Sequence, residues 1–251
     1  MRVGRVALVA MLVAFGCAPA HRNLLHDTVA SPYASLPPAP PAVAPHATPP
    51  APPVALGCEQ HPSIDVWEEK LRSHHQLRVT TDESLERAER LLPELRRLLE
   101  EDGLPPSLAL LPAVESSFRT HARAPSGGSA GLWQLRGPTA RRFGLTVNRR
   151  RDDRLHAARA TRAAARYLRY LHDRYGDWPL TLAAYNAGEG RVDRARARQP
   201  EASFWELAAT GGLPRISADY VPRFLALVRI ADDERACGRD DAARRADLVI
   251  Q

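Results

Sequence analysis

Apolar residues recur at intervals of three and four through most of the chain after residue 62, which is the spacing of one face of an α-helix. The first predicted helix has an apolar face of three residues: Ile64, Trp67 and Leu71. Thr80 and Glu83 have capping-box spacing. They precede a second apolar series: Leu85, Ala88, Leu92, Leu95 and Leu99. Pro93 interrupts this series, so we expect the helix to bend or divide there.

Later segments continue the helical pattern. A helix that begins near Pro105 should bend at Pro112, just before Glu115. The run 155–175 is the longest predicted helix, and Gly176 ends it. Shorter helices are predicted at 180–186, 191–198 and 220–234. No segment shows a convincing strand alternation and no internal repeat is visible, so we expect an all-α fold with one compact helical domain.

The first residues have the pattern of an export signal. Arg2 and Arg5 precede an apolar run at 6–15 that is too short to span a bilayer. The run ends at Gly16 and Cys17, and a small residue before a cysteine resembles a bacterial lipoprotein processing site. We therefore predict a signal peptide over 1–17 with lipidation at Cys17. An ordinary cleaved signal is the alternative.

Proline and alanine dominate the next segment, 18–58, which we expect to be a disordered linker. Residues 28–58 contain no Asp, Glu, Lys or Arg, and ten of the 22 prolines fall between 32 and 53. Such a chain cannot build a core and favours an extended, polyproline-like tether. We then expect a helical segment at 59–103 that packs on a main domain at 104–236, followed by a tail at 237–251.

Composition narrows the compartment and the partners. The 251 residues are 44% hydrophobic, enough for one compact domain with extensions, and the formal charge is +6. Lys70 is the only lysine, so the charge is almost wholly arginine, which favours a solvated basic surface over a nucleic-acid site. An exported basic protein would suit an anionic wall polymer. Cys58 and Cys237 can pair in an oxidising compartment or remain separate thiols.

Glu115 is an isolated carboxylate. The 36 residues that follow it contain eight Arg but no Asp or Glu, and its neighbours at 110, 111, 113 and 114 are apolar. Such surroundings raise a carboxyl pKa and suit a general acid, whereas a solvent-facing helix carboxylate is the simpler interpretation. Most glycosidases need a second carboxylate. Asp152 and Asp153 are the first candidates downstream, but they precede a helix, where capping explains them more simply.

Further polar and aromatic side chains lie in two short motifs. The amides of Gln134 and Asn186 can orient sugar hydroxyl or N-acetyl groups without titrating. Tyr185 could hydrogen-bond the carboxyl or the substrate, and Trp133 could pack against a sugar face. For each residue alone, a structural role in a helical domain is about as plausible as a functional one.

The order and spacing of these motifs carry a resemblance. Glu115-Ser116, then Gly131-Leu-Trp-Gln134, then Ala184-Tyr-Asn-Ala-Gly188 resemble the soluble-lytic-transglycosylase-like catalytic domain of the goose-type lysozyme superfamily. The resemblance extends over about residues 62–233, which makes 104–236 the catalytic domain. It implies cleavage of peptidoglycan between N-acetylmuramic acid and N-acetylglucosamine, with formation of 1,6-anhydromuramyl ends. Glu115 would be the only general acid and base, assisted by the substrate's own N-acetyl group.

Carried over by position, the resemblance implies supporting roles toward substrate and acid for five residues: Ser116, Gln134, Tyr185, Asn186 and Tyr220. It implies no metal or cofactor. It also implies peptidoglycan strands as partner and a periplasmic protein that Cys17 would anchor to the outer membrane. One departure is that a family Glu-Thr pair is replaced by Ile216 and Ser217. A lysozyme-type hydrolase and a non-catalytic peptidoglycan-binding lipoprotein remain the alternatives.

Overall fold

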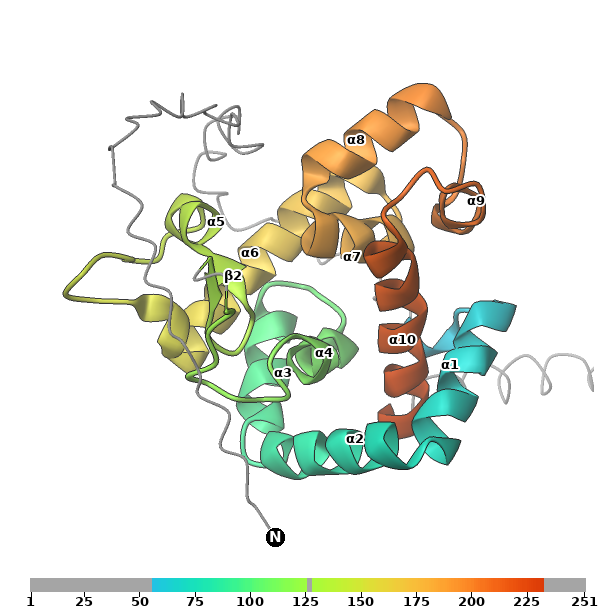
Figure 1. The fold of residues 1–251 in the computed structure, drawn as a ribbon. Coiled ribbons are helices and arrows are strands. Elements are labelled where there is room, and N and C mark those ends of the chain that lie inside the picture. Colours follow the sequence, from blue (N-terminus) through green and yellow to red (C-terminus); the bar gives the residue numbers. More distant parts are fainter. Residues whose placement is uncertain (1–55, 126–127, 233–251) are drawn as a thin grey trace, which may run out of the picture. The chain divides into compact units, whose positions relative to one another are not determined.

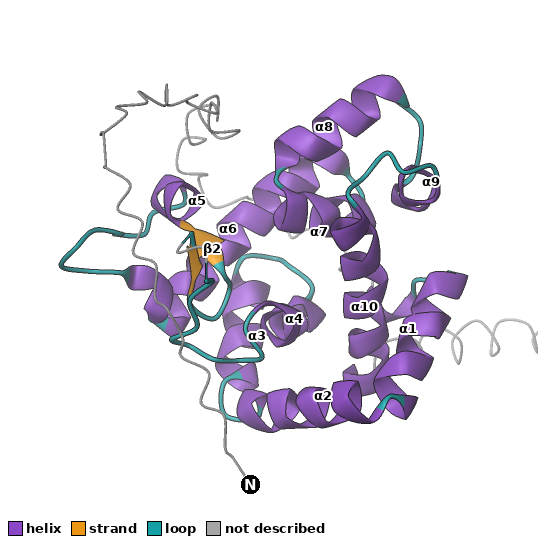
Figure 2. Cartoon of the chain, in the orientation of Figure 1, coloured by secondary structure: helices purple, strands orange, loops and turns teal. Residues whose placement is uncertain are grey.

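The fold comes from a computed structural model that describes residues 56–125 and 128–232. The all-α prediction is confirmed, because the regular elements of this part of the chain are helices apart from one short antiparallel hairpin, β1 (Ser129–Ala130) with β2 (Leu135–Arg136) (Figure 2). The α-helices are α1 (Pro62–Ser73), α2 (His75–Ala88), α3 (Leu92–Glu101), α4 (Leu111–Glu115), α5 (Gly137–Arg142), α6 (Ala157–Tyr175), α7 (Trp178–Ala187), α8 (Glu189–Arg198), α9 (Phe204–Ala209) and α10 (Arg215–Asp232). The 3-10 helices are η1 (Leu56–Cys58), η2 (Pro106–Leu110) and η3 (Asp153–Leu155).

The long predicted helix corresponds to α6. Its apolar stripe is buried, including Leu168 and Leu171, and Gly176 ends it in the left-handed conformation with φ +65°. The helix begins later than predicted, because His156 accepts a hydrogen bond from the backbone N–H of Arg159 and caps it. The sequence therefore predicted the C-terminal end of α6 correctly, because glycine readily takes the left-handed backbone that ends a helix.

The predicted capping box at Thr80 is wrong. Helix α2 begins at His75, where the ring nitrogen of His74 accepts from the backbone N–H of Leu77. Thr80 lies inside α2, and its hydroxyl donates to the carbonyl of Gln76 at 2.8 Å. Pro93 divides the apolar series as expected, because it stands in the first turn of α3.

The spacing of apolar residues did not predict several short elements. The segment before Glu115 is two pieces, η2 and α4, with Pro112 in the first turn of α4. The hairpin, α5 and α9 were not predicted. A capping box of Ser203 and Glu206 starts α9, so this helix did carry a readable local signal.

Helix α4 lies between α2 and α10, and α10 also packs against α1 and α7 (Figure 1). Large side chains fill the core without solvent contact, among them Trp133, Phe204 and Phe224. Arg229 on α10 donates to the carbonyl of Glu59 at 2.6 Å and joins the chain before α1 to this core. Because α4 has only five residues, it depends on these neighbours for stability.

Several predictions fall on other parts of the chain. The signal peptide, most of the linker, Cys17, Cys237 and the tail lie outside the described residues. Cys58 is disulfide-bonded, and Cys237, which the sequence offers as a possible partner, lies outside the described residues. Among the described residues, no helix combines the length and apolar character needed to cross a membrane.

Gly131→Ala should destabilise the fold far more than Gly176→Ala. Both glycines have positive φ, which costs another residue about 1–2 kcal/mol. At Gly131 an added Cβ would also lie 1.8 Å from the backbone oxygen of Arg154, whereas at Gly176 it would meet nothing within 4 Å. We expect a loss of about 3 kcal/mol or more against about 1 kcal/mol, measured by urea unfolding. Equal losses would contradict the close approach.

Candidate active site

Glu115 and Tyr220 form the centre of the candidate site. Glu115 ends α4, and the hydroxyl of Tyr220 on α10 donates to its Oε1 at 2.5 Å. Tyr220 is buried, and Glu115 is half-buried. The surrounding protein raises the pKa of Glu115 to about 7 by desolvation, and the Tyr220 hydrogen bond opposes that rise. The carboxyl can therefore hold a proton near neutral pH.

Ser116 fixes the end of α4. Its hydroxyl is buried and donates to the carbonyl of Leu132 at 2.8 Å. The next two residues, Ser117 and Phe118, take φ values of 51° and 57°, an unfavourable backbone for residues other than glycine. Arg87 on α2 holds this turn, because its Nε donates to the carbonyl of Ser117 at 2.8 Å. Neighbouring elements thus maintain the strained turn beside the carboxyl.

The turn at 131–134 places Gln134 but buries Trp133. Gln134 has φ 46°, and its side-chain Nε2 donates to the carbonyl of Gly131 at 2.8 Å. The expectation that Trp133 packs against a sugar is wrong. Its side chain is 0% exposed, and its indole N–H donates to Thr161 on α6. The tryptophan anchors the turn to the core.

Helix α7 supplies Tyr185 and Asn186 to the same region. The Tyr185 hydroxyl donates to the carbonyl of Trp133 at 2.7 Å. Burial raises the pKa of Tyr185 well above its ordinary value, and the nearby Glu115 carboxylate adds to that rise. The side-chain oxygen of Asn186 accepts from the Ser217 hydroxyl at 2.8 Å. Tyr185 therefore holds the 131–134 turn, and Ser217 orients the Asn186 amide.

Ile216 and Ser217, which stand in place of the family Glu-Thr pair, differ in their exposure to solvent. Ser217 is 2% exposed and bonds Asn186, whereas Ile216 is 77% exposed. The chain thus keeps a hydroxyl at the second position of the pair. It has no carboxylate at the first.

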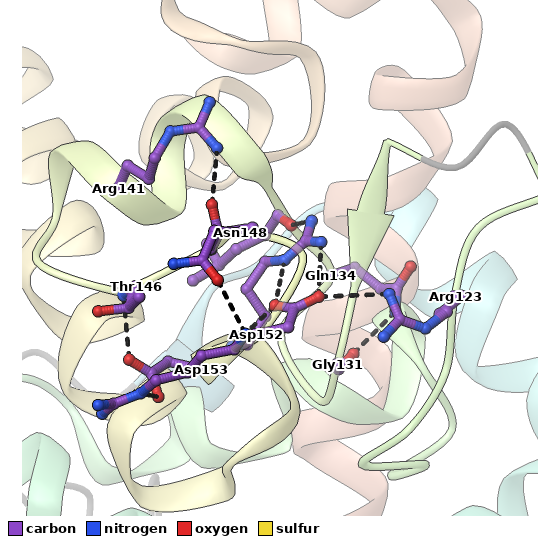
Figure 3. Close-up of polar contacts among 12 residues, drawn as sticks. Arg123, Gly131, Gln134, Arg141, Thr146, Asn148, Asp152 and Asp153 are labelled. Carbon is purple, nitrogen blue, oxygen red and sulfur yellow. Dashed lines mark hydrogen bonds and ion pairs between the residues drawn. The ribbon is translucent and has the colours of Figure 1, made fainter.

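Asp152 and Asp153 belong to an arginine network (Figure 3). Asp152 accepts from the backbone and guanidinium of Arg154, and Asp153 pairs with Arg151 at 2.8 Å. Hydrogen bonds from these arginines lower the pKa of both carboxyls. The interpretation of Asp152 as a cap is confirmed, because it caps η3. Both carboxyls therefore stay ionised and are bonded to arginine side chains.

A buried ion pair near Tyr185 was missed. Arg142 and Glu189 lie 3.1 Å apart with side chains 7% and 9% exposed, and the Tyr167 hydroxyl donates to Glu189 at 3.2 Å. The Tyr167 ring lies 5.4 Å from the Tyr185 ring. Glu189 directly follows Gly188 of the third motif, which is the only sequence signal for it. Its arginine partner stands 47 residues away, beyond any local pattern.

Residues 96–208 match the family model described as the transglycosylase SLT domain. Over 141 residues, 54% of its length, the chain is 40% identical to membrane-bound lytic murein transglycosylase D of Escherichia coli. Over 110 residues, 43% of this chain, it is 42% identical to an Alteromonas protein named for tributyltin chloride resistance. The predicted resemblance to a lytic-transglycosylase catalytic domain is confirmed.

The chain covers 30% of the first relative and 53% of the second, so neither is matched along its whole length. A solved structure of an inactive mutant of lytic transglycosylase Slt from Pseudomonas aeruginosa is also similar. It is 27% identical with a TM-score of 0.49, over 57% of this chain and 24% of that one. The SLT domain model includes Glu115, Gln134 and Asn186, and it ends before Tyr220.

Tyr220→Phe should raise the pKa of Glu115 above about 7. The variant removes the hydrogen bond that lowers this pKa and leaves the desolvation that raises it. Titration of labelled glutamate carboxyls by NMR, with the Glu115 signal assigned through Glu115→Gln, measures the change. Tyr170→Phe is the control, since Tyr170 contacts Phe143 and Arg142 instead. An unchanged or lowered pKa in Tyr220→Phe would refute the described geometry.

Glu115→Gln should stabilise the protein in alkali more than in acid. Between pH 4.5 and about 7 the folded protein keeps a proton on Glu115 that the unfolded chain has released, so stability falls as pH rises. The loss is complete above about pH 7 and reaches roughly 3 kcal/mol at most. Urea unfolding should therefore show a gain at pH 8 and almost none at pH 4. The same gain at both pH values would mean that Glu115 is not desolvated.

Proposed function

We propose that this protein is a peptidoglycan lytic transglycosylase with Glu115 as its only general acid and base. It cleaves the β-1,4 bond between N-acetylmuramic acid and N-acetylglucosamine and leaves 1,6-anhydromuramyl ends. The observation that carries the proposal is the desolvated Glu115 carboxyl, bonded by Tyr220, with a pKa near neutrality. The SLT domain and the name of the E. coli relative support the same reaction class.

Glu115 acts twice in the reaction, first as the acid and then as the base. Protonated Glu115 donates to the glycosidic oxygen as the bond to C1 breaks, and the muramyl N-acetyl oxygen bonds C1 in its place. The Glu115 carboxylate then takes the proton of the muramyl C6 hydroxyl, whose oxygen attacks C1 and displaces the N-acetyl oxygen. Glu115 is protonated again and no water is consumed. One carboxyl is enough for this sequence.

The supporting residues divide into two roles. Ser116, Tyr185 and Tyr220 hold the carboxyl and its neighbouring turn, because their hydroxyls bond protein groups. Asn186 and Gln134 would bind the substrate. Since Ser217 occupies the Asn186 oxygen, the Asn186 N–H groups are suited to bind the substrate's acetamido or hydroxyl oxygens.

Hydrolysis of the same bond is the nearest alternative. It needs a base to activate water, and three carboxylates could be considered: Asp152, Asp153 and Glu189. Each is paired with arginine in the structure. A non-catalytic peptidoglycan-binding lipoprotein is the second alternative, favoured by the exposed Ile216 at the position of a family carboxylate.

The cellular setting is part of the proposal. A signal peptide over 1–17 would export the chain to the periplasm, and lipidation of Cys17 would anchor it to the outer membrane. The segment 18–58 would let the domain reach the wall. The net charge of +6 suits the anionic polymer that serves as substrate.

Digestion of purified sacculi tests the reaction. We expect the soluble products to carry anhydromuramyl ends, each lighter by one water than a reducing end in mass spectrometry. Glu115→Gln should reduce turnover by at least about 10³-fold while sacculus binding persists, because it removes the only proton donor. Glu94→Gln, an exposed helix carboxylate on α3, is the matched control. Reducing ends alone would refute the transglycosylase assignment, and an inactive wild type would favour the binding protein.

A further inference from the structure

The proposed reaction leaves the buried ion pair between Arg142 and Glu189 without a role. The two side chains stand at the end of α5 and the start of α8, are 7% and 9% exposed, and lie 3.1 Å apart. Two charges taken out of water gain little net stability from their attraction, because the desolvation of both opposes it, and apolar side chains can fill such a place equally well. The stability of the fold therefore does not account for the pair.

Two aromatic rings lie against the Arg142 guanidinium. Its central carbon is 4.4 Å from the centre of the Tyr170 ring and 5.3 Å from that of the Phe143 ring. Such rings attract a cation without accepting a conventional hydrogen bond. Nη1 donates to Glu189, whereas the buried Nε and Nη2 have no hydrogen-bond partner within 56–125 and 128–232. Glu189 is therefore the acceptor that sets the direction of the guanidinium in this part of the chain.

Glu189 in turn fixes Tyr167 on α6. The Tyr167 hydroxyl donates to Oε2 of Glu189 at 3.2 Å, while Arg142 bonds Oε1. The Tyr167 side chain is buried, and its ring centre lies 5.0 Å from that of Phe143 and 5.4 Å from that of Tyr185. A buried ring that is bonded at its hydroxyl and packed against two other rings has little freedom to shift.

Tyr185 carries this constraint from the Tyr167 ring to the candidate site. Its hydroxyl donates to the carbonyl of Trp133 at 2.7 Å. Burial raises the pKa of Tyr185, and the Glu115 carboxylate lies near enough to add to that rise. A shift of the Tyr185 ring would therefore move the turn at 131–134 and loosen the packing beside the Glu115 carboxyl.

The turn at 131–134 serves both the acid and a predicted substrate-binding residue. Gln134 has φ 46°, an unfavourable backbone angle that the surrounding contacts must maintain. The carbonyl of Leu132 accepts from the Ser116 hydroxyl at 2.8 Å, and Ser116 directly follows Glu115. The placement of Gln134 relative to Glu115 therefore depends on how firmly this turn is held.

We propose that Arg142 and Glu189 are positioning residues for the cleavage reaction, acting through Tyr167 and Tyr185 on the turn at 131–134. This role rests on the proposed function, because what the pair controls is the rate of that reaction. Neither side chain donates or accepts a proton in it. The pair holds the turn in one arrangement, and a turn that is free to shift would misplace the groups around the bound sugar.

The buried-pair variant, Arg142→Met with Glu189→Leu, replaces both charges by apolar side chains of similar volume. The fold should persist, with Tm within about 5 °C of wild type. With solubilised glycan strands as substrate, kcat should fall about tenfold or more while KM stays within about twofold, because binding is kept and alignment is lost. An unchanged kcat would overturn the positioning role.

The surface-pair variant, Arg174→Gln with Asp193→Asn, is the matched control. This ion pair joins α6 to α8 at 2.8 Å, its side chains are 44% and 35% exposed, and the Tyr175 hydroxyl donates to Asp193 at 2.9 Å. The variant removes the same kinds of contact at the surface, so kcat and KM should both stay within about twofold.

Tyr167→Phe breaks the same connection without touching either charge. It removes the hydroxyl that bonds Glu189, so kcat should fall about threefold or more with little change in KM. If the buried-pair variant does not fold, this variant decides, and an unchanged kcat in it would overturn the role.

Tyr185→Phe distinguishes positioning through Tyr185 from an independent effect on the structure. This substitution removes the hydrogen bond to Trp133, the last connection in the series. If the ion pair acts through that bond, the buried-pair substitutions should lower kcat by less than about twofold in the Tyr185→Phe background, because coupled residues have non-additive effects. A further loss of about tenfold in that background would contradict the proposal.

The pKa of Glu115 supplies a measurement that needs no turnover. Looser packing of Tyr185 admits water beside the carboxyl, so this pKa should fall below about 7 in the buried-pair variant and stay at that value in the surface-pair variant. NMR titration of labelled glutamate carboxyls measures both, and equal values would overturn the positioning role. An inactive wild type would contradict the proposed function instead, and the two pKa values would still decide whether the ion pair holds the site.

Discussion

The hydrogen bond between Tyr220 and Glu115 is the interaction on which the site depends. It joins two side chains 105 positions apart in sequence, one at the end of a five-residue helix and the other on a long one. A carboxyl moved into protein surroundings tends to stay protonated, while a donor at 2.5 Å stabilises its ionised form. The balance keeps the pKa near 7, so Glu115 can both give and receive a proton in neutral solution.

Maintaining that balance requires a rigid frame. Helix α4 is too short to be stable alone, and the residues after it have strained backbone angles. Arg87 and Ser116 tie this segment to α2 and to the 131–134 turn, and Trp133 fastens the turn to α6. The free energy that opposes desolvation and strain comes from the apolar core around these contacts. The residues around Glu115 thereby determine the acidity of its carboxyl.

The sequence predicted the periodic part of the fold well. Helix α6 was readable because its stripe, length and terminal glycine agree. The prediction that Thr80 starts a helix was wrong, because α2 begins at His75 and already includes Thr80. A capping box is a local pattern, and it starts no helix inside one that has already begun. The prediction that Trp133 packs against a sugar was wrong, because sequence spacing does not distinguish a side chain in a substrate groove from one in the core. The Arg142–Glu189 pair joins residues 47 apart, and such contacts follow from tertiary packing alone.

The exchange at Ile216 shows which chemistry the site retains. With an apolar, exposed side chain there, the position supplies no carboxylate, yet Ser217 beside it still orients the Asn186 amide. Amides and hydroxyls do not titrate near neutrality, and the carboxylates of Asp152, Asp153 and Glu189 are held by arginines. Glu115 is the carboxyl of the candidate site whose pKa burial raises to about 7. A site arranged in this way relies on desolvation at one residue to set its pH response.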